Sequence, residues 1–525
     1  MHICNDLRHQ LVSLGHVDPA DNEIYDFGLF LLNKILQQSG KQLDDFPPMP
    51  VAQYNWDSHI KNHYINEQLN YDCTEEHNKF LDQVVLLNQE QRDAYKQIMA
   101  SIENQQGCLF FLNGQGSTGK TYVYNTLCYK ICSKGWIVLC VASSGIIALL
   151  LQGGCTVHSM FKIPVEGLTD KSFCSIPKES LLAKIICQTR LIILDKATMQ
   201  HQFTFEAVDR TCRDVRNNKD CPFGGITVVF GGDYQQILPV VIKGSQEAII
   251  GATLQHSYLW QDINLLRLWQ NKRLEHGEHD DEAHEFANWL LDTGHGCNLS
   301  PDETISLPQH MQCHNPALLI DFVYSRIGAN SNSPPPNYFL NHVILAAHNA
   351  DVETINNDVL SWMSTDKRVY YSADNVVMEQ GADGVSADEN RFPVKFLHTL
   401  NASGLPPGEL SLKIGCPLIL LWNLAPAQGL CNGTQMVLLC MSNRVLEVRL
   451  IGGDHNGEVA FIPQVSLTPL GSTVDFAFQL KRCQFPVRLA FAITINKVQG
   501  QSAKYVGLDL RIPVFAHGQL YVALS

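Results

Sequence analysis

Short apolar runs that end in polar residues recur along the first half of the chain. Residues 108–112 (CLFFL) precede a glycine-rich loop and a helix-like segment at 121–135, and the apolar run 136–142 follows. Two further runs, 191–194 and 226–230, each end in a polar tip. Strands that alternate with helices form parallel sheets covered on both faces. The pattern therefore predicts an α/β lobe.

A second set of apolar runs lies in the last third of the chain. Residues 342–348, 417–422 and 488–495 have the length and composition of strands in a second α/β lobe. Between the last two, residues 436–453 have the pattern of a β-hairpin, and Asn-Gly-Thr at 432–434 suits its entry turn. We predict two lobes with parallel sheets and a small β insertion in the second.

The chain has 525 residues, which is too long for one hydrophobic core. Before the first lobe, residues 25–38 have helical spacing, and the proline-rich segment 45–50 ends that pattern. The expected parts are an N-terminal helical and linker region at 1–80, a first lobe at 81–270 with a small insertion near 165–190, a connecting helical segment at 271–341, and a second lobe at 342–525 with its β insertion at about 424–485.

Composition restricts the functional classes. Hydrophobic residues make up 45% and charged residues 17%, which is typical of a folded globular chain. No apolar run approaches the ~18 residues of a membrane helix, and the N-terminus has no secretory pattern. The 17 cysteines lack paired metal spacing, so we expect reduced thiols. The net charge of −14 argues against broad coating of nucleic acid, but it allows a local basic groove.

The segment Gly114–Thr121, GQGSTGKT, matches the phosphate-loop pattern GxxxxGK[ST]. Its glycines let backbone N–H groups point at phosphate oxygens, Lys120 reaches the β and γ phosphates, and Thr121 binds Mg²⁺. An ordinary strand-to-helix turn is the alternative. The apolar run before the loop and the helical pattern after it favour the phosphate loop.

Two polar tips of the first lobe complete a candidate nucleotide site. Ligands of open parallel sheets bind at the carboxyl ends of the strands. Asp195 follows the run 191–194 and would hold Mg²⁺ through water, and Gln236 follows the run 226–230 and would sense the γ-phosphate. A plain turn is the alternative for either residue, but three polar tips in one lobe favour a shared site.

A series of segments occurs here in the order of a known motif series. They are LNQEQRDAYKQI (87–98), GQGSTGKT, VASSGIIALLLQGGCTVHSMFKIP (141–164), LIILDKATM, FGGITVVFGGDYQQILPVV (224–241), LWQNKRL (268–274), LAAHNADVETIN (345–356), AFAITINKVQGQS (490–502) and GQLYVALS (518–525). Over roughly residues 25–525 the chain resembles the Pif-one-type (petite integration frequency) ATP-dependent DNA helicases of superfamily one. Its sequence is most similar to the branch carried by Helitron transposons, in which the segments DFPPMP and CPLILLWNLAPAQGLCNGT also have counterparts.

The resemblance implies a fold and an activity. The expected fold is two RecA-like P-loop NTPase lobes with parallel sheets and a small SH3-like β insertion in the second. The expected function is a 5′ to 3′ helicase that uses ATP and Mg²⁺ to move along single-stranded DNA and to open forked duplex DNA. The resemblance also implies a role in DNA repair, recombination, telomere maintenance or Helitron transposition, and a monomeric state. A nuclear location rests on the resemblance alone, because the sequence has no compact basic import signal.

The resemblance also implies roles for single residues. Those expected to act on the triphosphate are Lys120, Asp195, Gln236 and Arg273, with Thr121 and Asp195 holding Mg²⁺. Those expected to bind the nucleotide are Gln91, Gly114, Gly116, Gly119, Lys120, Thr121, Gln499 and Gly500. Those expected to contact DNA are Thr156, His158, Phe161, Asn349, Thr494 and Lys497. Taken singly, Phe161 suits a core position better than base stacking, and His158 suits a structural hydrogen bond.

The chain departs from the family pattern at several positions. Lys196 stands where the family has a glutamate that orients or deprotonates the attacking water, and an ordinary lysine cannot accept a proton at neutral pH. Lys196 could also pair with Asp195 and compete with Mg²⁺. Ser117 and Val498 replace a glycine and a serine, and the sequence stops at Ser525, before an arginine of the last motif. Because Lys196 replaces the glutamate and the given sequence lacks that arginine, we expect slow hydrolysis of ATP.

Three functions follow. The first is a working helicase. The second is a transposon-derived remnant that binds ATP and single-stranded DNA without efficient hydrolysis. A P-loop kinase or GTPase is disfavoured, because neither explains the motifs from Asn349 to Ser525.

Overall fold

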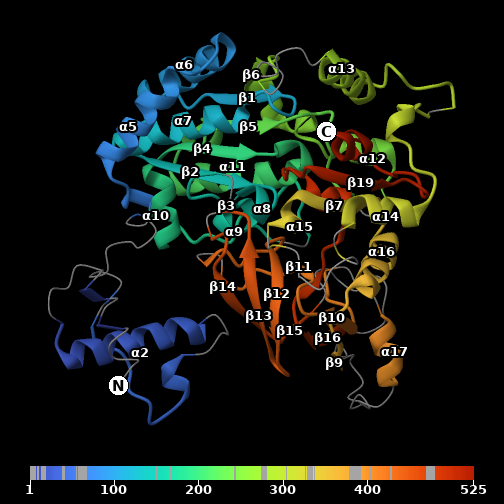
Figure 1. Cartoon of the computed structure of the whole chain (residues 1–525). Coiled ribbons are helices and arrows are strands. Elements are labelled where there is room, and N and C mark those ends of the chain that lie inside the picture. The colour runs from blue at the N-terminus through green and yellow to red at the C-terminus, as the bar shows by residue number, and fades with distance from the viewer. Residues whose placement is uncertain are drawn as a thin grey trace.

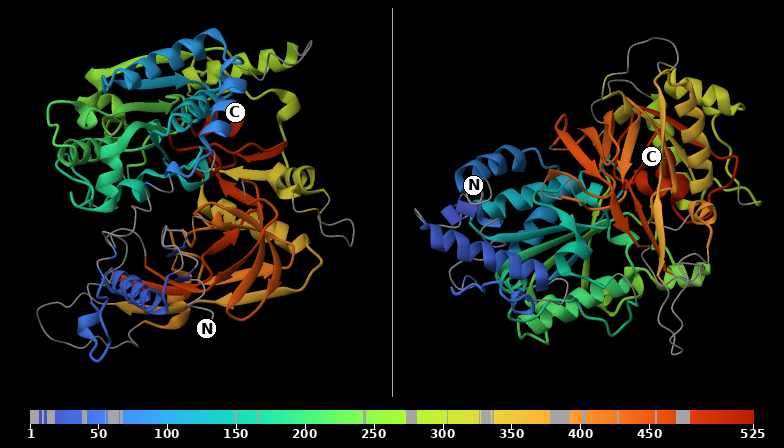
Figure 2. Two further views of the ribbon diagram at one scale, coloured as in Figure 1. Left: turned by 90° about the vertical axis from the view of Figure 1, so that its left-hand side faces the viewer. Right: turned by 90° about the horizontal axis from the view of Figure 1, so that it is seen from below.

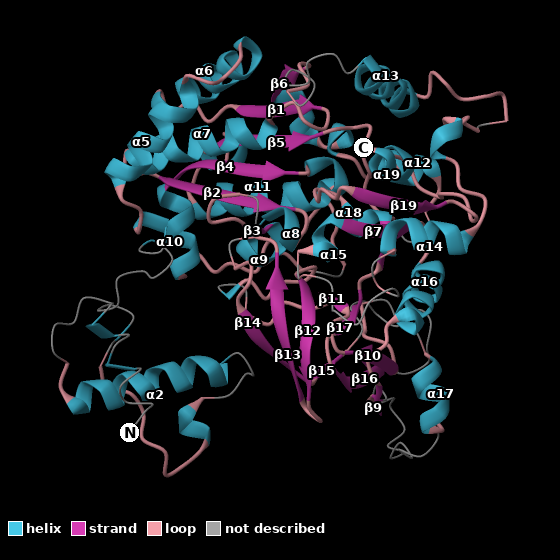
Figure 3. Ribbon diagram, viewed as in Figure 1, coloured by secondary structure: helices cyan, strands magenta, loops and turns pink. Residues whose placement is uncertain are grey.

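The computed structural model has two adjoining α/β regions and a separate N-terminal segment (Figures 1 and 3). It describes residues 7–8, 11–12, 19–37, 42–54, 56, 65, 68–148, 151–164, 167–241, 244–272, 281–302, 304–325, 327, 335, 337–377, 392–400, 404–425, 428–453, 455–468 and 479–525. None of the helices within these ranges combines the length and apolar character of a membrane span.

The first region contains a parallel sheet of six described strands in the order β3-β2-β4-β5-β1-β6. The strands are β1 (Leu109–Gly114), β2 (Ile137–Ala142), β3 (Cys155–Thr156), β4 (Thr189–Asp195), β5 (Thr227–Gly232) and β6 (Ile263–Leu268). The helices are α5 (Cys73–Val84), α6 (Gln89–Glu103), α7 (Lys120–Ser133), α8 (Gly145–Ala148), α9 (Val157–Phe161), α10 (Leu181–Gln188), α11 (Gln202–Val215) and α12 (Gln246–Gly251). The four predicted strands and the helix after the loop are confirmed.

Alternate residues of β1 show why this sheet is covered on both faces. Leu109 and Phe111 pack in a core with Phe205 of α11. Phe110 and Leu112 pack in a second core with residues of α6 and α7. Because successive side chains of a strand point to opposite faces, a continuous apolar run fits only a strand buried on both sides. The loops after β1, β4 and β5 therefore meet at one edge of the sheet.

The second region combines a small parallel sheet with antiparallel sheets. Helices α13 (Asp281–His295), α14 (Pro316–Tyr324) and α15 (Tyr338–Asn341) lead into it. The parallel strands are β7 (His342–Ala346), β18 (Ala492–Thr494) and β19 (Tyr505–Asp509), with β7 in the middle. The helices are α16 (Asn349–Trp362), α17 (Val394–Thr399), α18 (Ile495–Val498) and α19 (Gln519–Leu524).

A five-stranded antiparallel sheet in the order β14-β13-β12-β11-β17 adjoins the parallel one (Figure 2). Its strands are β11 (Pro417–Leu420), β12 (Gln435–Met441), β13 (Val445–Ile451), β14 (Val459–Pro463) and β17 (Val487–Leu489). Two smaller antiparallel sheets contain β8 (Lys367–Tyr371) with β10 (Glu409–Lys413), and β9 (Ala373–Val377) with β15 (Val465–Leu467) and β16 (Gln479–Gln484). The predicted hairpin is β12–β13, with its entry turn at Asn432–Gly433.

Two predicted strands of the second lobe were wrong. Residues 417–422 were expected in the parallel set, but β11 pairs antiparallel with β12 and β17. Residues 488–495 were expected as one strand, but the chain leaves β17 and enters β18 of the parallel sheet. The Asn356 side chain stabilises this break, because its amide donates to Leu489 O (3.2 Å) and Ala492 O (3.0 Å) and accepts from Ala492 N (2.8 Å).

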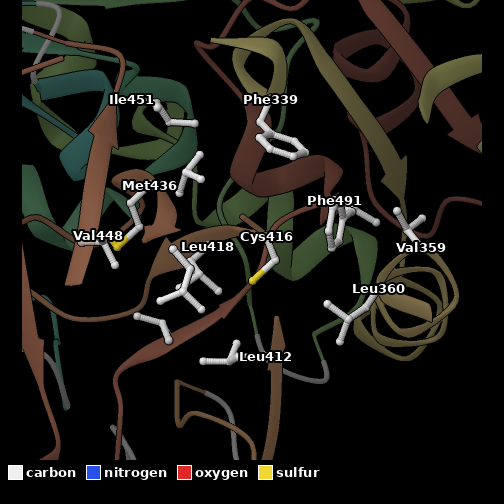
Figure 4. Packing of buried hydrophobic residues seen from close by; sticks show 14 of the residues in the cluster. Phe339, Val359, Leu360, Leu412, Cys416, Leu418, Met436, Val448, Ile451 and Phe491 are labelled. Atoms are coloured by element: carbon white, nitrogen blue, oxygen red, sulfur yellow. The ribbon is translucent and has the colours of Figure 1, made fainter. Parts of the chain in front are cut away.

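One hydrophobic core joins the parallel and antiparallel parts of the second region. Figure 4 shows Val359 and Leu360 of α16 and Phe491 on one side of this core, and Leu418, Met436 and Val448 of the antiparallel sheet on the other. Because these residues share one core, the β insertion and the parallel sheet are expected to move together.

A buried ion pair fixes the smaller antiparallel sheet. Arg482 of β16 and Asp374 of β9 are both fully buried, and Arg482 Nη2 lies 2.8 Å from Asp374 Oδ2. The same guanidinium donates to the carbonyl oxygens of Leu397, Leu400 and Pro406. Buried charges need such complete pairing, so this arginine holds the chain after α17 against the sheet.

The N-terminal segment contains α2 (Asp21–Gln37), as the helical pattern predicted, and lies at the edge of the molecule in Figure 1. Asp26 organises it: the carboxylate accepts from Gln53 N, Tyr54 N and Trp56 Nε1, the last at 2.7 Å. These bonds hold the proline-rich stretch against the helix.

Candidate functional site

The phosphate loop connects β1 to α7, as its motif predicted. Lys120, the first residue of α7, is 8% exposed, and its ammonium donates to the carbonyl oxygens of Gly114 and Gln115. Burial, together with the positive charge of Lys196, lowers the pKa of Lys120 to about 8, although Asp195 and Asp233 oppose the shift. The loop therefore holds a buried cation close to two carboxylates.

Gln91 of α6 is hydrogen-bonded to this loop. Its Nε2 donates to Thr118 O at 3.0 Å, and its Oε1 accepts from Asn88 N at 3.1 Å in a capping box. Gly119 has a φ of +81°, and a Cβ there would collide with Gln91 Nε2. Only glycine allows this approach. The amide of Gln91 is thus engaged with the loop, and its role at an adenine ring stays a prediction.

Asp195 ends β4 beside the phosphate loop and is 6% exposed. Its Oδ1 is buried and accepts no hydrogen bond of regular geometry from the described residues, although the Tyr124 hydroxyl lies beside the carboxylate. Gly231 of β5 lies so close that a Cβ there would be 3.2 Å from Asp195 Oδ1 and would overlap the Tyr124 hydroxyl. A buried carboxylate oxygen without a regular hydrogen bond fits a cation, so Thr121 and Asp195 suit Mg²⁺. The described residues contain no cluster of three or more His, Cys, Asp or Glu that fits a metal.

The pairing of Lys196 with Asp195 that the sequence allowed does not occur, because the ammonium of Lys196 bonds to Gln236 instead. Lys196 follows β4 in the left-handed region (φ 54°), which turns its side chain toward β5, and its Nζ donates to Gln236 Oε1 at 2.8 Å. Gln236 Nε2 lies 3.3 Å from Asp233 Oδ2. The residue that replaces the expected glutamate therefore bonds to the predicted γ-phosphate sensor.

The second region contacts the same sensor. Gln499, 4% exposed and just after α18, donates from Nε2 to Gln236 Oε1 at 2.8 Å. Gly518, just before α19, approaches the Gln236 backbone so closely that a Cβ would overlap it, and His517 Nε2 lies 3.0 Å from Tyr234 O. Gln236 is thus the point where both regions meet the nucleotide site.

A cavity of about 620 Å³ lies within the second region. It opens between α16, the β8–β10 pair and the break between β17 and β18, and its lining includes Asn349, Thr494 and Lys497. Three of the residues predicted to contact DNA are therefore brought together.

Sequence reasoning missed Arg488, which lines the same cavity. Its Nε is buried without a hydrogen-bond partner in the described chain, and its Nη2 donates to Leu405 O at 2.9 Å. Lys497 as a whole is exposed, but partial desolvation of its ammonium at the cavity wall, with repulsion from Arg488, lowers its pKa to about 8. No ion pair within the described residues neutralises either cation. The sequence signal for this site was the position of Arg488 inside the apolar run FPVRLAFA. Burying a cation without a partner is costly, so an arginine in such a run indicates a ligand or a polar partner.

The remaining predicted residues have mixed outcomes. Phe161 is fully buried in the first core, so the prediction that it contacts DNA was wrong, because no ring face is free for a base. Thr156 caps α9 by accepting from Ser159 N, and burial lowers the pKa of His158, which leaves the imidazole neutral. Their DNA roles stay predictions. Arg273 lies outside the described residues.

Two glycines of the predicted nucleotide site differ in their surroundings. A Cβ on Gly116 would meet nothing within 4 Å, so the loop is open there. Gly500 has a φ of +88°, and its Cβ would lie 3.0 Å from Ile147 of the first region. Gly500 therefore packs between the two regions, and a direct contact with nucleotide stays a prediction.

Two family models match the chain. Residues 86–304 match the PIF1-like helicase model, and residues 395–440 match that of the 2B domain of DNA helicase Pif1. The first match contains the phosphate loop, Asp195 and Gln236, and the second contains β10, β11 and most of β12.

Curated relatives extend the likeness over most of the chain. An ATP-dependent DNA helicase Pif1 of Psychrobacter sp. is 26% identical over 453 residues, which is 79% of this chain and 63% of the relative. PIF6 of Trypanosoma brucei brucei is 24% identical, covering 80% of this chain and 50% of the relative. PIF1 of Mus musculus is 26% identical, covering 80% and 56%. The chain thus spans between half and two thirds of the length of these relatives.

Solved structures share the fold. A Pif1 structure described as unwinding forked duplex DNA by two coordinating helicases matches with a TM-score of 0.57 and 24% identity, over 83% of this chain and 89% of that one. A Bacteroides Pif1 in complex with ADP-AlF3 and single-stranded DNA matches with a TM-score of 0.56 and 24% identity, over 82% and 89%. The predicted α/β fold of two lobes is confirmed.

Proposed function

We propose that this chain, which belongs to the PIF1-like helicase family, hydrolyses ATP to move along single-stranded DNA and to separate duplex DNA. The observation that carries the proposal is the double contact at Gln236, whose Oε1 accepts from Lys196 of the first lobe and Gln499 of the second. A nucleotide site that both lobes share is what converts phosphate chemistry into lobe movement.

ATP binds through the phosphate loop in this proposal. The backbone N–H groups between Gly114 and Lys120 and the N-terminus of α7 favour phosphate, and the Lys120 ammonium exchanges its loop carbonyls for phosphate oxygens. Thr121 and Asp195 hold Mg²⁺, which neutralises phosphate charge. Asp233 and Gln236 lie where the terminal phosphate is expected, at the carboxyl ends of the strands.

Single-stranded DNA lies against the cavity of the second lobe. Lys497 and Arg488 supply cations for backbone phosphates, and Asn349 and Thr494 supply polar contacts at the same wall. Phosphate contacts give most of the affinity for a strand without selecting its sequence. Lys497 lies in α18, and Gln499 follows that helix directly. The residue proposed to hold DNA and the residue that contacts Gln236 are therefore only two positions apart.

This short connection supports coupling. A change in the Gln236–Gln499 contact during the ATP cycle displaces α18 and with it Lys497. The phosphodiester held there moves relative to the first lobe, and repetition advances the strand. A 5′ to 3′ direction is part of the proposal and rests on the resemblance.

A strand-displacement assay tests the proposed function. We expect ATP-dependent release of a labelled strand from a fork with a 5′ single-stranded tail, and none from a duplex with only a 3′ tail. Lys120→Ala is expected to abolish release, and Lys184→Ala, on the exposed side of α10, to preserve it. Release that needs no ATP, or that persists in Lys120→Ala, would refute the proposal.

The comparisons favour a working helicase and give no support to a nonhydrolysing remnant. We further propose a monomer, a nuclear location and a place in the Helitron branch, each of which rests on the resemblance. Light scattering with and without forked DNA tests the first, and imaging of a tagged chain tests the second.

A further inference from the structure

The ammonium of Lys196 lies in the nucleotide site without a carboxylate partner. Its hydrogen-bond acceptor is the neutral amide oxygen of Gln236, at 2.8 Å, and the nearby Asp233 carboxylate feels its charge without forming an ion pair with it. Lys196 is half-buried. It follows β4, and Lys120 begins α7 after β1, so two lysines lie at the carboxyl edge of the sheet, where an anionic ligand would attract both.

Gln236 Oε1 is already saturated. An amide oxygen has two lone pairs, and here Lys196 Nζ and Gln499 Nε2 each occupy one at 2.8 Å. A phosphate oxygen is a stronger acceptor for an ammonium than a neutral amide oxygen, because its negative charge adds Coulomb attraction to the hydrogen bond. A terminal phosphate near Gln236 would therefore take Lys196 from the amide.

We propose that Lys196 binds the terminal phosphate of a nucleoside triphosphate and leaves Gln236 when it does so. The proposal rests on the proposed function and gives the residue that replaces the expected glutamate a phosphate-binding role in place of proton transfer. Gln499 is then the remaining partner of the two that share Gln236 Oε1 in this structure. The contact between the lobes therefore changes with the presence of the third phosphate.

The proposal predicts selective loss of triphosphate affinity. Lys196→Met keeps the length of the stem and removes the charge, and it is expected to weaken binding of a nonhydrolysable ATP analogue roughly tenfold while leaving ADP affinity within about twofold. Lys196→Arg keeps the charge and is expected to retain most of the preference for triphosphate. Lys184→Met, a lysine on exposed α10 outside the site, is the matched control and is expected to change neither affinity.

Equilibrium titration of fluorescent nucleotides against the full chain measures both affinities, and a thermal scan of each variant confirms folding. Equal weakening of ADP and triphosphate in Lys196→Met would overturn the proposal, because that result indicates a general structural role. An unchanged ratio of the two affinities would overturn it as well. Failure of the unmodified chain to bind either nucleotide would instead refute the proposed function.

Discussion

Raising the pH from 7 to 9 is predicted to weaken binding of single-stranded DNA through Lys497. Although Lys497 is exposed as a residue, partial desolvation of its ammonium at the cavity wall, with added repulsion from Arg488, lowers its pKa to about 8. The amine is therefore about nine-tenths protonated at pH 7 and about one-tenth protonated at pH 9. A DNA phosphate beside the amine raises its pKa in the complex, so binding takes up a proton and is favoured below pH 8. If the bound amine stays protonated, affinity falls about tenfold over this window.

Fluorescence anisotropy with a labelled oligothymidine, at fixed salt and without nucleotide, measures this effect. The control is Lys497→Arg, because a guanidinium keeps its charge through pH 9 and its affinity is expected to stay nearly constant. The other charged groups that line the cavity are the same in both proteins, namely Glu353, Glu409, Lys367, Lys413 and Arg488. Equal pH slopes in the two proteins, or no slope in the unmodified chain, would refute the assignment of Lys497 to a DNA phosphate.

Three stability predictions test the packing around the site. Arg482→Met strands the buried Asp374 carboxylate and should lower the free energy of unfolding by about 3–5 kcal/mol, as measured by denaturant titration; a loss below 1 kcal/mol would contradict this account. Phe161→Ala should cost about 3–5 kcal/mol through the cavity it leaves, with the DNA affinity of the folded fraction unchanged. Ser117 has a φ of 67°, so Ser117→Gly should raise the unfolding free energy by up to about 1 kcal/mol in a thermal scan, and a decrease would contradict the argument.

Local patterns predicted most of the first lobe. Its central strands β1, β2, β4 and β5 contain continuous apolar runs because helices cover both faces of the sheet, and the phosphate loop is a continuous motif between a strand and a helix. The second lobe was harder to predict. A short apolar run does not reveal its pairing partner, so β11 was expected in a parallel sheet, and the break between β17 and β18 depends on Asn356, more than 130 residues earlier in the chain.

The nucleotide site was likewise predictable only where its residues belong to local motifs. Lys120 and Asp195 were predictable because their chemistry follows from the loop or strand they end. The partner of Lys196 was not, because Gln236 lies 40 residues away and adjacency to Asp195 suggested an ion pair. The link to Gln499 spans 263 residues and exists only in the folded chain. Phe161 shows the opposite error, since a motif position was assigned to DNA although its apolar character already favoured the core.

Steady-state ATP hydrolysis with and without single-stranded DNA tests most directly whether the two lobes share one nucleotide site that responds to DNA. We predict turnover in the unmodified chain that DNA stimulates, loss of turnover in Lys120→Ala, and a smaller ratio of DNA-stimulated to basal turnover in Gln499→Ala, because that variant removes the contact between the lobes at Gln236. Turnover that DNA leaves unchanged, or DNA stimulation that is unaffected in Gln499→Ala, would contradict the account.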